Sequence, residues 1–129
     1  MPQLTVDSSC IVAVIQAESG AEAIMARLQQ GDCVMSTVNV AEVAAKLAER
    51  GATADEIDSG LSTFGLEFLP FDAAQAVATG MLRPTTRSLG LSLGDRACLS
   101  LAIALGTPVL TTDRAWASLS LPIDVILAR

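Results

Sequence analysis

Four acidic residues are the strongest candidates for chemistry in this sequence, because each borders an apolar segment and has hydroxyl, amide or glycine neighbours. They are Asp7, Glu42, Asp95 and Asp113. Two unit charges about 4 Å apart repel by about 4 kcal/mol at an effective dielectric constant near 20, so a cluster of carboxylates needs protons or a divalent cation. Oxygen ligands without His or Cys favour Mg²⁺ or Mn²⁺ over Zn²⁺. If the four side chains meet, they form a site for one of these two metals.

Each of the four acids also has a simpler explanation as a helix cap. A side-chain oxygen at the start of a helix accepts backbone N–H groups, which adds about 1 kcal/mol of stability. Taken one at a time, capping explains all four acids. The two interpretations are compatible, because helices that follow parallel strands begin at the same edge of the sheet. The spacing alone leaves both open.

Several kinds of catalysis are excluded by what the sequence lacks. There is no His and no Tyr, so imidazole triads, His-ligated zinc and a tyrosine base are absent. Neither Gly-x-x-x-x-Gly-Lys nor Gly-x-Gly-x-x-Gly occurs, so the sequence has no sign of these two nucleotide-binding loops. If the protein is an enzyme, its carboxylates must carry the reaction.

The composition predicts one compact domain over residues 1–129, with 51% hydrophobic residues and no low-complexity segment. Eight Lys and Arg stand against fourteen Asp and Glu, which gives a formal net charge of −6. Broad nonspecific binding to nucleic acid depends on many basic residues, so any nucleic-acid contact must be local. Seven of the eight basic residues are Arg, and Lys46 is the only Lys.

The three cysteines predict free thiols rather than a disulfide framework or a zinc site, because they are few and widely spaced within apolar runs. They are Cys10, Cys33 and Cys98. No uninterrupted apolar run reaches the roughly 18 residues that a membrane span requires. We therefore expect a protein of the reducing cytoplasm with no membrane segment.

Strand-like and helix-like segments alternate along the chain. Short apolar runs predict strands at residues 4–6, 33–35, 66–69, 107–111 and 125–127, the last at the edge of the sheet. Helical periodicity predicts helices at residues 20–30, 39–50, 53–64, 72–82 and 93–105, and Asn39-Val-Ala-Glu42 resembles a capping box at the start of the second of these. The β-branched run 10–17 also suits a strand, but the N-cap sequence Asp7-Ser-Ser before it favours a helix. The alternation predicts a parallel sheet covered on both faces, with the site at the carboxyl ends of its strands. The segment 83–90 contains Pro and two arginines and is expected to be a functional loop.

Four short motifs occur in an order and spacing that resemble a PIN domain, specifically the VapC-type toxin ribonucleases. They read Val6-Asp-Ser-Ser9, Asn39-Val-Ala-Glu42, Leu91-Ser-Leu-Gly-Asp95 and Leu110-Thr-Thr-Asp113. The resemblance runs nearly from end to end and keeps all four acids. It implies a three-layer α/β/α PIN-like domain with a central, mostly parallel sheet of four to five strands.

The resemblance also implies a reaction, the Mg²⁺- or Mn²⁺-dependent endonucleolytic cleavage of RNA. The four acids would form the catalytic and metal-binding quartet, with Asp7 and Asp95 as the most secure ligands. The cation would lower the pKa of a bound water that attacks the phosphate and leaves a 5′-phosphate and a 3′-hydroxyl. Ser9 and Thr111 would orient the carboxylates or the phosphate, although capping and strand pairing explain these two residues equally well.

Several other residues are given roles by their positions. Two residues are assigned structural roles: Asp72 is expected to cap a helix, and Trp116 to pack behind Asp113, with stacking on an RNA base as the alternative for Trp116. Four arginines near the proposed mouth of the site are expected to neutralise RNA phosphates, with a solvated surface as the alternative. They are Arg83, Arg87, Arg96 and Arg114.

The family further implies an RNA substrate, with transfer RNA as one candidate, a small antitoxin that covers the acidic groove, and a homodimer. Two other functions stay open at this stage. One is a PIN-like module that binds RNA or protein without catalysis. The other is a phosphoacceptor receiver domain, which shares the layer order and an acidic Mg²⁺ pocket but needs a Lys after a late strand, whereas Lys46 lies within a predicted helix.

Overall fold

A computed structural model describes residues 1–129 and contains one sheet of five parallel strands in the order β3-β2-β1-β4-β5. Every neighbouring pair is parallel, as the alternation of strands and helices predicts. The three inner strands are fully buried, whereas the two edge strands are partly exposed. The strands are β1 (Leu4–Val6), β2 (Cys33–Ser36), β3 (Glu67–Leu69), β4 (Val109–Thr111) and β5 (Val125–Leu127).

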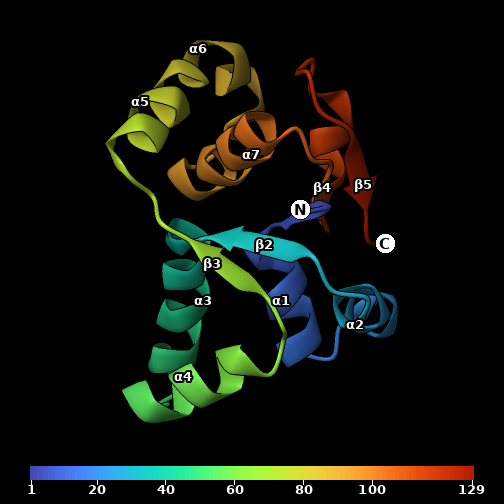
Figure 1. Cartoon of the computed structure of the whole chain (residues 1–129), viewed down its shortest axis with the longest axis vertical. Helices are drawn as coiled ribbons and strands as arrows, with labels where there is room; N and C mark the ends of the chain where they lie inside the picture. The colour runs from blue at the N-terminus through green and yellow to red at the C-terminus, as the bar shows by residue number, and fades with distance from the viewer.

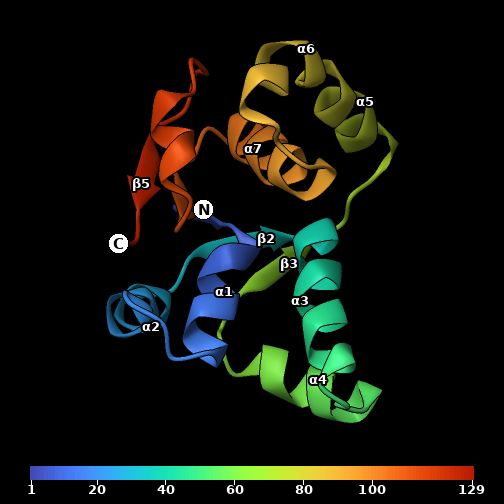
Figure 2. The ribbon, with the colours of Figure 1, turned by 180° about the vertical axis from the view of Figure 1, so that it is seen from behind.

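Helices cover both faces of the sheet, which confirms the predicted three-layer α/β/α architecture. Figures 1 and 2 show α1, α3 and α4 on one side with α2 beside α1, and α5, α6 and α7 on the other. The α-helices are α1 (Ser8–Ile15), α2 (Ala21–Gln29), α3 (Thr37–Glu49), α4 (Ala54–Ser62), α5 (Ala73–Met81), α6 (Arg83–Thr86) and α7 (Leu93–Leu105). Two 3₁₀ helices, η1 (Arg87–Leu89) and η2 (Arg114–Ser118), complete the chain.

The strand order reverses at β1, which has β2 on one side and β4 on the other. In parallel sheets, ligands bind beyond the carboxyl ends of the strands at such a reversal, because the connections to the two sides diverge there and leave a crevice. Asp7 directly follows β1, and Asp113 follows β4 by two residues. The backbone N–H of Asp7 donates to Leu110 O at 2.9 Å, which fixes the two strand ends side by side.

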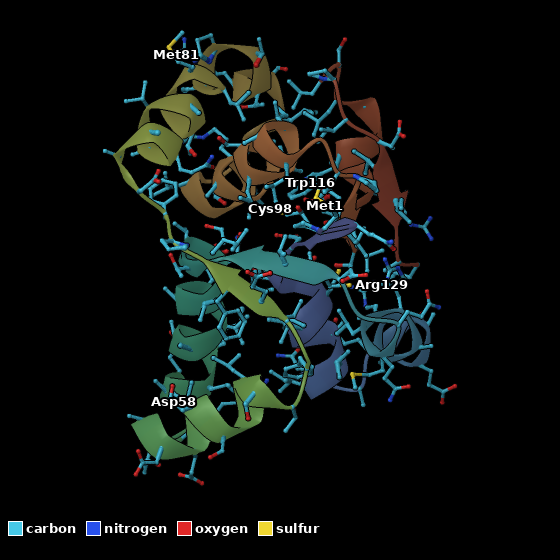
Figure 3. The ribbon with its side chains drawn as sticks, in the orientation of Figure 1. Met1, Asp58, Met81, Cys98, Trp116 and Arg129 are labelled. Carbon is cyan, nitrogen blue, oxygen red and sulfur yellow. The ribbon has the colours of Figure 1, made fainter.

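The core consists of two buried apolar clusters. One cluster joins strands β1, β2 and β4 to helices α1, α2, α3 and α4, and the other joins α7, β4 and η2 around Trp116. Trp116 is fully buried, as expected of a packing residue, and lies near Cys98 in the middle of the molecule (Figure 3). All three cysteines are free and buried, as the sequence predicts. No helix is both long and apolar enough to span a membrane.

The segment 83–90 is not the loop expected from its composition, because it folds into α6 and η1. Pro84 lies in the first turn of α6, where a missing N–H costs nothing. The hydroxyls of Thr85 and Thr86 both donate to Leu82 O, at 3.1 and 2.8 Å. Thr86 is buried. A segment rich in Pro and hydroxyl residues is therefore tied to the preceding helix.

Helix α3 begins two residues earlier than expected. Its N-cap is Ser36, whose hydroxyl accepts the Val38 N–H at 3.2 Å. Asn39 and Glu42 therefore lie inside the helix and do not form the capping box that their spacing suggests. Asn39 instead donates its side-chain amide to Glu42 Oε1 at 2.8 Å.

Candidate functional site

Asp7 is the most buried carboxylate of the proposed site, with 3% of its surface exposed. It occupies the N-cap position of α1 but makes no capping hydrogen bond through its side chain. Its Oδ2 accepts the hydroxyls of Ser9 at 2.7 Å and Thr111 at 3.0 Å. Its Oδ1 is buried without any hydrogen-bond partner. Capping therefore does not explain Asp7, because its side chain accepts hydroxyl groups from Ser9 in α1 and Thr111 in β4 rather than backbone N–H groups of the helix.

The electrostatic surroundings of Asp7 raise the pKa of its carboxyl from 3.8 to about 6. Burial is the largest cause, since it disfavours the ionised form. The hydrogen bonds from Ser9 and Thr111 lower the pKa, whereas the negative charges of Asp95 and Glu42 raise it. The structure therefore brings these two acids close enough to Asp7 to repel its charge.

Glu42 projects from α3 and connects three helices. Its Oε1 accepts the Ser8 hydroxyl at 2.9 Å and the Asn39 amide at 2.8 Å. The same amide of Asn39 donates to Gly94 O at 3.0 Å, at the start of α7. A methyl group on Gly94 would overlap the Glu42 carboxylate. Gly94 thus leaves the space in which Glu42 is held.

Asp95 and Asp113 do act as caps, in agreement with the simpler explanation of their positions. Asp95 Oδ2 accepts the Ser92 N–H at 2.9 Å, and the Ser92 hydroxyl accepts the Asp95 N–H at 3.1 Å, which completes a capping box. Asp113 Oδ1 accepts the Ala115 N–H at 3.0 Å. Each carboxylate uses one oxygen for the cap. The other oxygen of each, Asp95 Oδ1 and Asp113 Oδ2, has no hydrogen bond within the protein.

A cavity of about 270 Å³ brings three of the four predicted acids together at the carboxyl ends of β1 and β4. Glu42 does not line this cavity, although its charge reaches Asp7. Val12 is the only hydrophobic residue among those that line the cavity. The lining residues are Asp7, Ser8, Ser9, Val12, Glu18, Lys46, Asp95, Thr112 and Asp113. We call this space the acidic cavity.

The donor chemistry of the acidic cavity fits Mg²⁺ or Mn²⁺. The ligands on offer are oxygens only, and Asp7 Oδ1 is a buried acceptor without a donor. In the present side-chain positions, no group of three or more acidic or thiol side chains is arranged to hold one metal ion. In these positions Asp95 is bonded to Ser92, and Glu42 is bonded to Ser8 and Asn39.

Lys46 and Glu18 line the acidic cavity but were not predicted from the sequence. Lys46 follows Glu42 by four residues in α3, so both lie on one face of the helix. This spacing is a signal that could have identified Lys46. Glu18 lies in the turn between α1 and α2 and pairs with Arg129, with 3.0 Å between Oε1 and Nη1. No local pattern distinguishes Glu18 from a surface acid.

None of the four predicted arginines lines the acidic cavity. Arg83, Arg87 and Arg114 are exposed, and their contact with RNA stays a prediction. The side chain of Arg96 donates to Thr79 O at 3.2 Å and thereby connects α7 to α5. Among the acids outside the quartet, Asp72 accepts the Gln75 N–H at 2.9 Å and so is the helix cap expected from the sequence.

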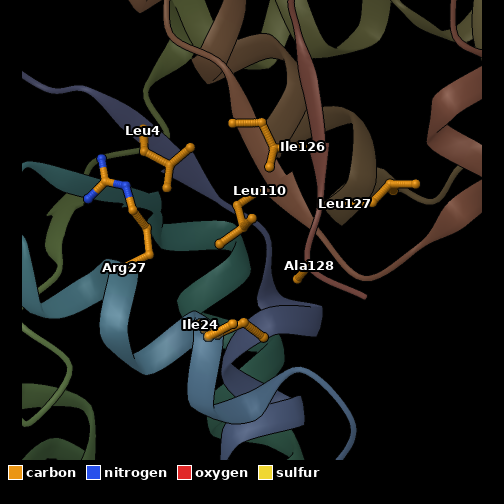
Figure 4. Close-up of a pocket in the computed structure, with 8 residues that line it drawn as sticks. Leu4, Ile24, Arg27, Leu110, Ile126, Leu127 and Ala128 are labelled. Atoms are coloured by element: carbon orange, nitrogen blue, oxygen red, sulfur yellow. The ribbon is translucent and has the colours of Figure 1, made fainter.

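A second cavity, of about 260 Å³, lies between α2 and strands β1, β4 and β5 (Figure 4). Seven of its eight lining residues are hydrophobic, and the eighth is Arg27. Arg27 donates to Gly31 O at 3.1 Å. The cavity contains no carboxylate, thiol or hydroxyl, so it offers no group for acid–base or metal chemistry. The acidic cavity is therefore the candidate functional site.

The sequence model of the PIN domain family matches residues 4–120. This chain is a PIN domain protein. The PIN domain is 33% identical over 115 residues to Ribonuclease VapC42 of Mycobacterium tuberculosis and, equally, to a VapC ribonuclease of Mycobacterium bovis. Each alignment covers 83% of this chain and 88% of the relative. The resemblance noted in the four motifs is thus confirmed over most of the PIN domain, which belongs to the VapC group.

Solved structures share the fold of this PIN domain at lower sequence identity. A DNA-bound VapBC structure from Salmonella typhimurium matches with a TM-score of 0.74 at 18% identity, and the match covers all of both chains. A DNA-bound VapBC2 structure from Rickettsia felis matches with a TM-score of 0.67 at 19% identity, over 95% of this chain and 96% of the other. A toxin–antitoxin complex from Klebsiella pneumoniae gives 0.69 at 14% identity, over 95% of this chain and 100% of the other.

Proposed function

We propose that this PIN domain, which spans residues 1–129, is a metal-dependent endoribonuclease and the toxin of a toxin–antitoxin pair. The observation that carries the proposal is Asp7, a buried carboxylate that caps no helix and faces the cavity shared with Asp95 and Asp113. A buried acid with a free oxygen costs stability, so its position needs a functional reason. The names of the relatives, which are ribonucleases, support the reaction class.

Asp7, Glu42, Asp95 and Asp113 are the residues that would hold Mg²⁺ or Mn²⁺. The bound metal would supply Lewis-acid stabilisation of the phosphate and a water of lowered pKa. Asp95 can join the metal site by rotating away from Ser92, a single exposed hydrogen bond. Glu42 is more firmly held by Ser8 and Asn39.

The remaining chemistry falls to side chains that are already in place. Ser9 and Thr111 fix the orientation of Asp7 by donating to the same oxygen, Oδ2, so that Oδ1 stays available. Asp113 is exposed and uses only Oδ1 in its cap, so its Oδ2 is free either to hold the metal or to accept a proton from the attacking water. In-line attack would form a new P–O bond and break the P–O3′ bond, which leaves a 5′-phosphate, and the departing 3′-oxygen would take a proton from solvent to become the 3′-hydroxyl. Arg83, Arg87 and Arg114 are exposed cations for more distant phosphates.

The proposal includes partners. The structural neighbours are VapBC and toxin–antitoxin complexes, which supports a small antitoxin that binds over the acidic cavity and restrains the nuclease. RNA is the substrate, with transfer RNA as the family's suggestion. A homodimer is supported by α5, whose exposed side contains Val77 and Met81 at 68% and 72% exposure. Three free thiols are consistent with a reducing cytoplasm.

The decisive experiment incubates the purified protein with end-labelled RNA and Mn²⁺, alongside the variants Asp7→Asn and Asp95→Asn. We expect cleavage by the wild type and a loss of at least a hundredfold in both variants, on the order of the loss of a metal ligand. Asp72→Asn is the matched control, because Asp72 is an acid that only caps a helix. Absence of cleavage by the wild type would favour the non-catalytic alternative, and equal cleavage by Asp7→Asn would refute the assigned site.

A further inference from the structure

Lys46 is the only basic residue that lines the acidic cavity, where it stands among the carboxylates of Asp7, Glu18, Asp95 and Asp113. It extends from α3 one helical turn after Glu42. Because it is the only Lys in the chain, its position in this cavity is not one of many similar surface lysines.

The ammonium group of Lys46 has no carboxylate partner within 4 Å. The single ion pair of the protein joins Arg129 to Glu18, another residue of the cavity. The ammonium group makes no hydrogen bond with a protein group either. A cation surrounded by acids usually pairs with one of them, so the unpaired ammonium is free to bind a ligand that enters the cavity.

The stem of Lys46 has a defined place although its charge is unpaired. Lys46 also lines a narrow, partly apolar groove between α1 and α3, together with Val12, Val43 and Leu47. Val12 borders both the groove and the acidic cavity. An aliphatic stem that lies along apolar side chains loses less freedom when its charged end binds a ligand.

An acidic cavity that receives RNA must overcome repulsion between its carboxylates and the phosphates. A bound metal ion offsets part of that charge, and a fixed cation on the protein offsets more. The arginines offer no alternative inside the cavity, because none of them lines it and Arg96 and Arg129 are engaged by Thr79 O and Glu18. Lys, a compact charge with three donors, suits the non-bridging oxygens of a phosphate.

We propose that Lys46 binds a non-bridging oxygen of the RNA phosphate that is held in the acidic cavity. This assignment rests on the proposed ribonuclease function and adds a substrate-binding residue to it. The ammonium group positions the phosphate and stabilises its negative charge, while the acids carry the metal and the water. Its contribution belongs to the binding of substrate, so it is expected to affect KM more than the rate of the chemical step.

The test compares Lys46→Met with Arg50→Met and Lys46→Arg. Lys46→Met keeps the apolar stem and removes the charge. Arg50→Met makes the same change in net charge at the end of the same helix, in the groove but outside the acidic cavity. We expect Lys46→Met to raise KM by about tenfold, since a hydrogen bond to a charged group is lost. The KM of Arg50→Met should stay near the wild-type value, and the KM of Lys46→Arg should lie between those of the wild type and Lys46→Met.

A second measurement separates a direct phosphate contact from a structural role. Each Lys46 or Arg50 variant is combined with Asp113→Asn, which removes one of the proposed catalytic acids so that the RNA stays intact. RNA binding by these proteins is then measured over a range of salt concentrations. Removing one phosphate contact should reduce the slope of log affinity against log salt by about 0.7 for single-stranded RNA, in Lys46→Met but not in Arg50→Met. Lys46 is exposed, so melting temperatures should not differ.

The outcomes are distinguishable from a failure of the proposed function. If the wild type cleaves RNA but Lys46→Met shows the wild-type KM and salt slope, the assignment of Lys46 is wrong and the nuclease stands. The same conclusion follows if Arg50→Met changes KM and the salt slope as much as Lys46→Met does. The effect would then come from the general electrostatic attraction between the protein and RNA. If the wild type neither binds nor cleaves RNA, both proposals fail together.

Discussion

The hydroxyl of Thr111 donates a 3.0 Å hydrogen bond to Asp7 Oδ2 across 104 residues of sequence. Thr111 ends β4, and Asp7 follows β1, the strand beside it. The same hydroxyl accepts the Asp113 N–H at 3.1 Å. One buried side chain therefore holds the carboxylate of Asp7 and the backbone of Asp113, and it does so at the reversal point of the sheet.

Thr111→Val tests this arrangement, because Val has the same shape without the hydroxyl. Asp7 would lose one of two donors, and the Asp113 N–H would lose its acceptor. We expect RNA cleavage to fall by about 10- to 100-fold and half-maximal activity to need more Mn²⁺. Thr5→Val is the matched control, because Thr5 forms a buried 2.8 Å hydroxyl pair with Thr107 away from the acids. Thr5→Val should lower stability by about 1–3 kcal/mol with an unchanged Mn²⁺ requirement; a similar change in both variants would contradict the argument.

Gly94→Ala is expected to lower activity even though Ala is the better helix former. A methyl group at this position overlaps the Glu42 carboxylate, which must then leave Ser8 and Asn39. Gly60→Ala in α4 is the control, because nothing lies within 4 Å of its added methyl group. It should gain up to about 1 kcal/mol in stability with full activity. Cleavage rates and melting temperatures of both variants check this, and full activity of Gly94→Ala would show that the position of Glu42 is unimportant.

The buried carboxyl of Asp7 predicts a stability that depends on pH. Its pKa is about 6 in the folded protein against 3.8 as the ordinary value. The unfolded chain therefore ionises first, and the free energy of unfolding falls as pH rises between about 4 and 6. Without divalent metal, Asp7→Asn should be more stable than the wild type above about pH 7, by up to about 3 kcal/mol. Urea unfolding in EDTA measures this gain, which should vanish below about pH 4. A gain of equal size at all pH values would contradict the assigned cause.

Much of this fold follows from the order of strand and helix patterns, because each inner strand is a short apolar run and each helix has its own periodicity. The sheet then places Asp7 and Asp113 together, since their strands are neighbours and end at the same edge. The position of Glu42 did not follow in the same way. Ser36 and Asn39 are both suitable caps for the start of α3, and the hydroxyl of Ser36 forms the cap.

Other parts of the site depend on side-chain directions that a linear pattern does not contain. Lys46 reaches the acidic cavity because α3 packs against α1 and α7, and Glu18 reaches it from a turn. The segment 83–90 looks like a loop because its helix is held by hydroxyl bonds to Leu82, which composition does not reveal. The expectation for Arg96 also missed its bond to Thr79, a contact between helices far apart in sequence.

The proposed homodimer can be tested at α5. The helix carries no charged residue from Ala73 to Met81, and most of its side chains are exposed. Figure 3 shows Met81 at the periphery of the molecule. An uncharged helix face of this kind is costly in water and is stabilised when a second copy covers it.

The double variant Val77→Glu, Met81→Glu introduces four negative charges into a symmetric interface. We expect it to elute as a monomer in size-exclusion chromatography at concentrations where the wild type is a dimer, because like charges would face each other across the two-fold axis. Ile126→Glu is the control, since Ile126 is an exposed apolar residue of β5 at 45% exposure. Loss of the dimer in Ile126→Glu alone would move the interface from α5 to the edge of the sheet, next to the apolar cavity between α2 and β5.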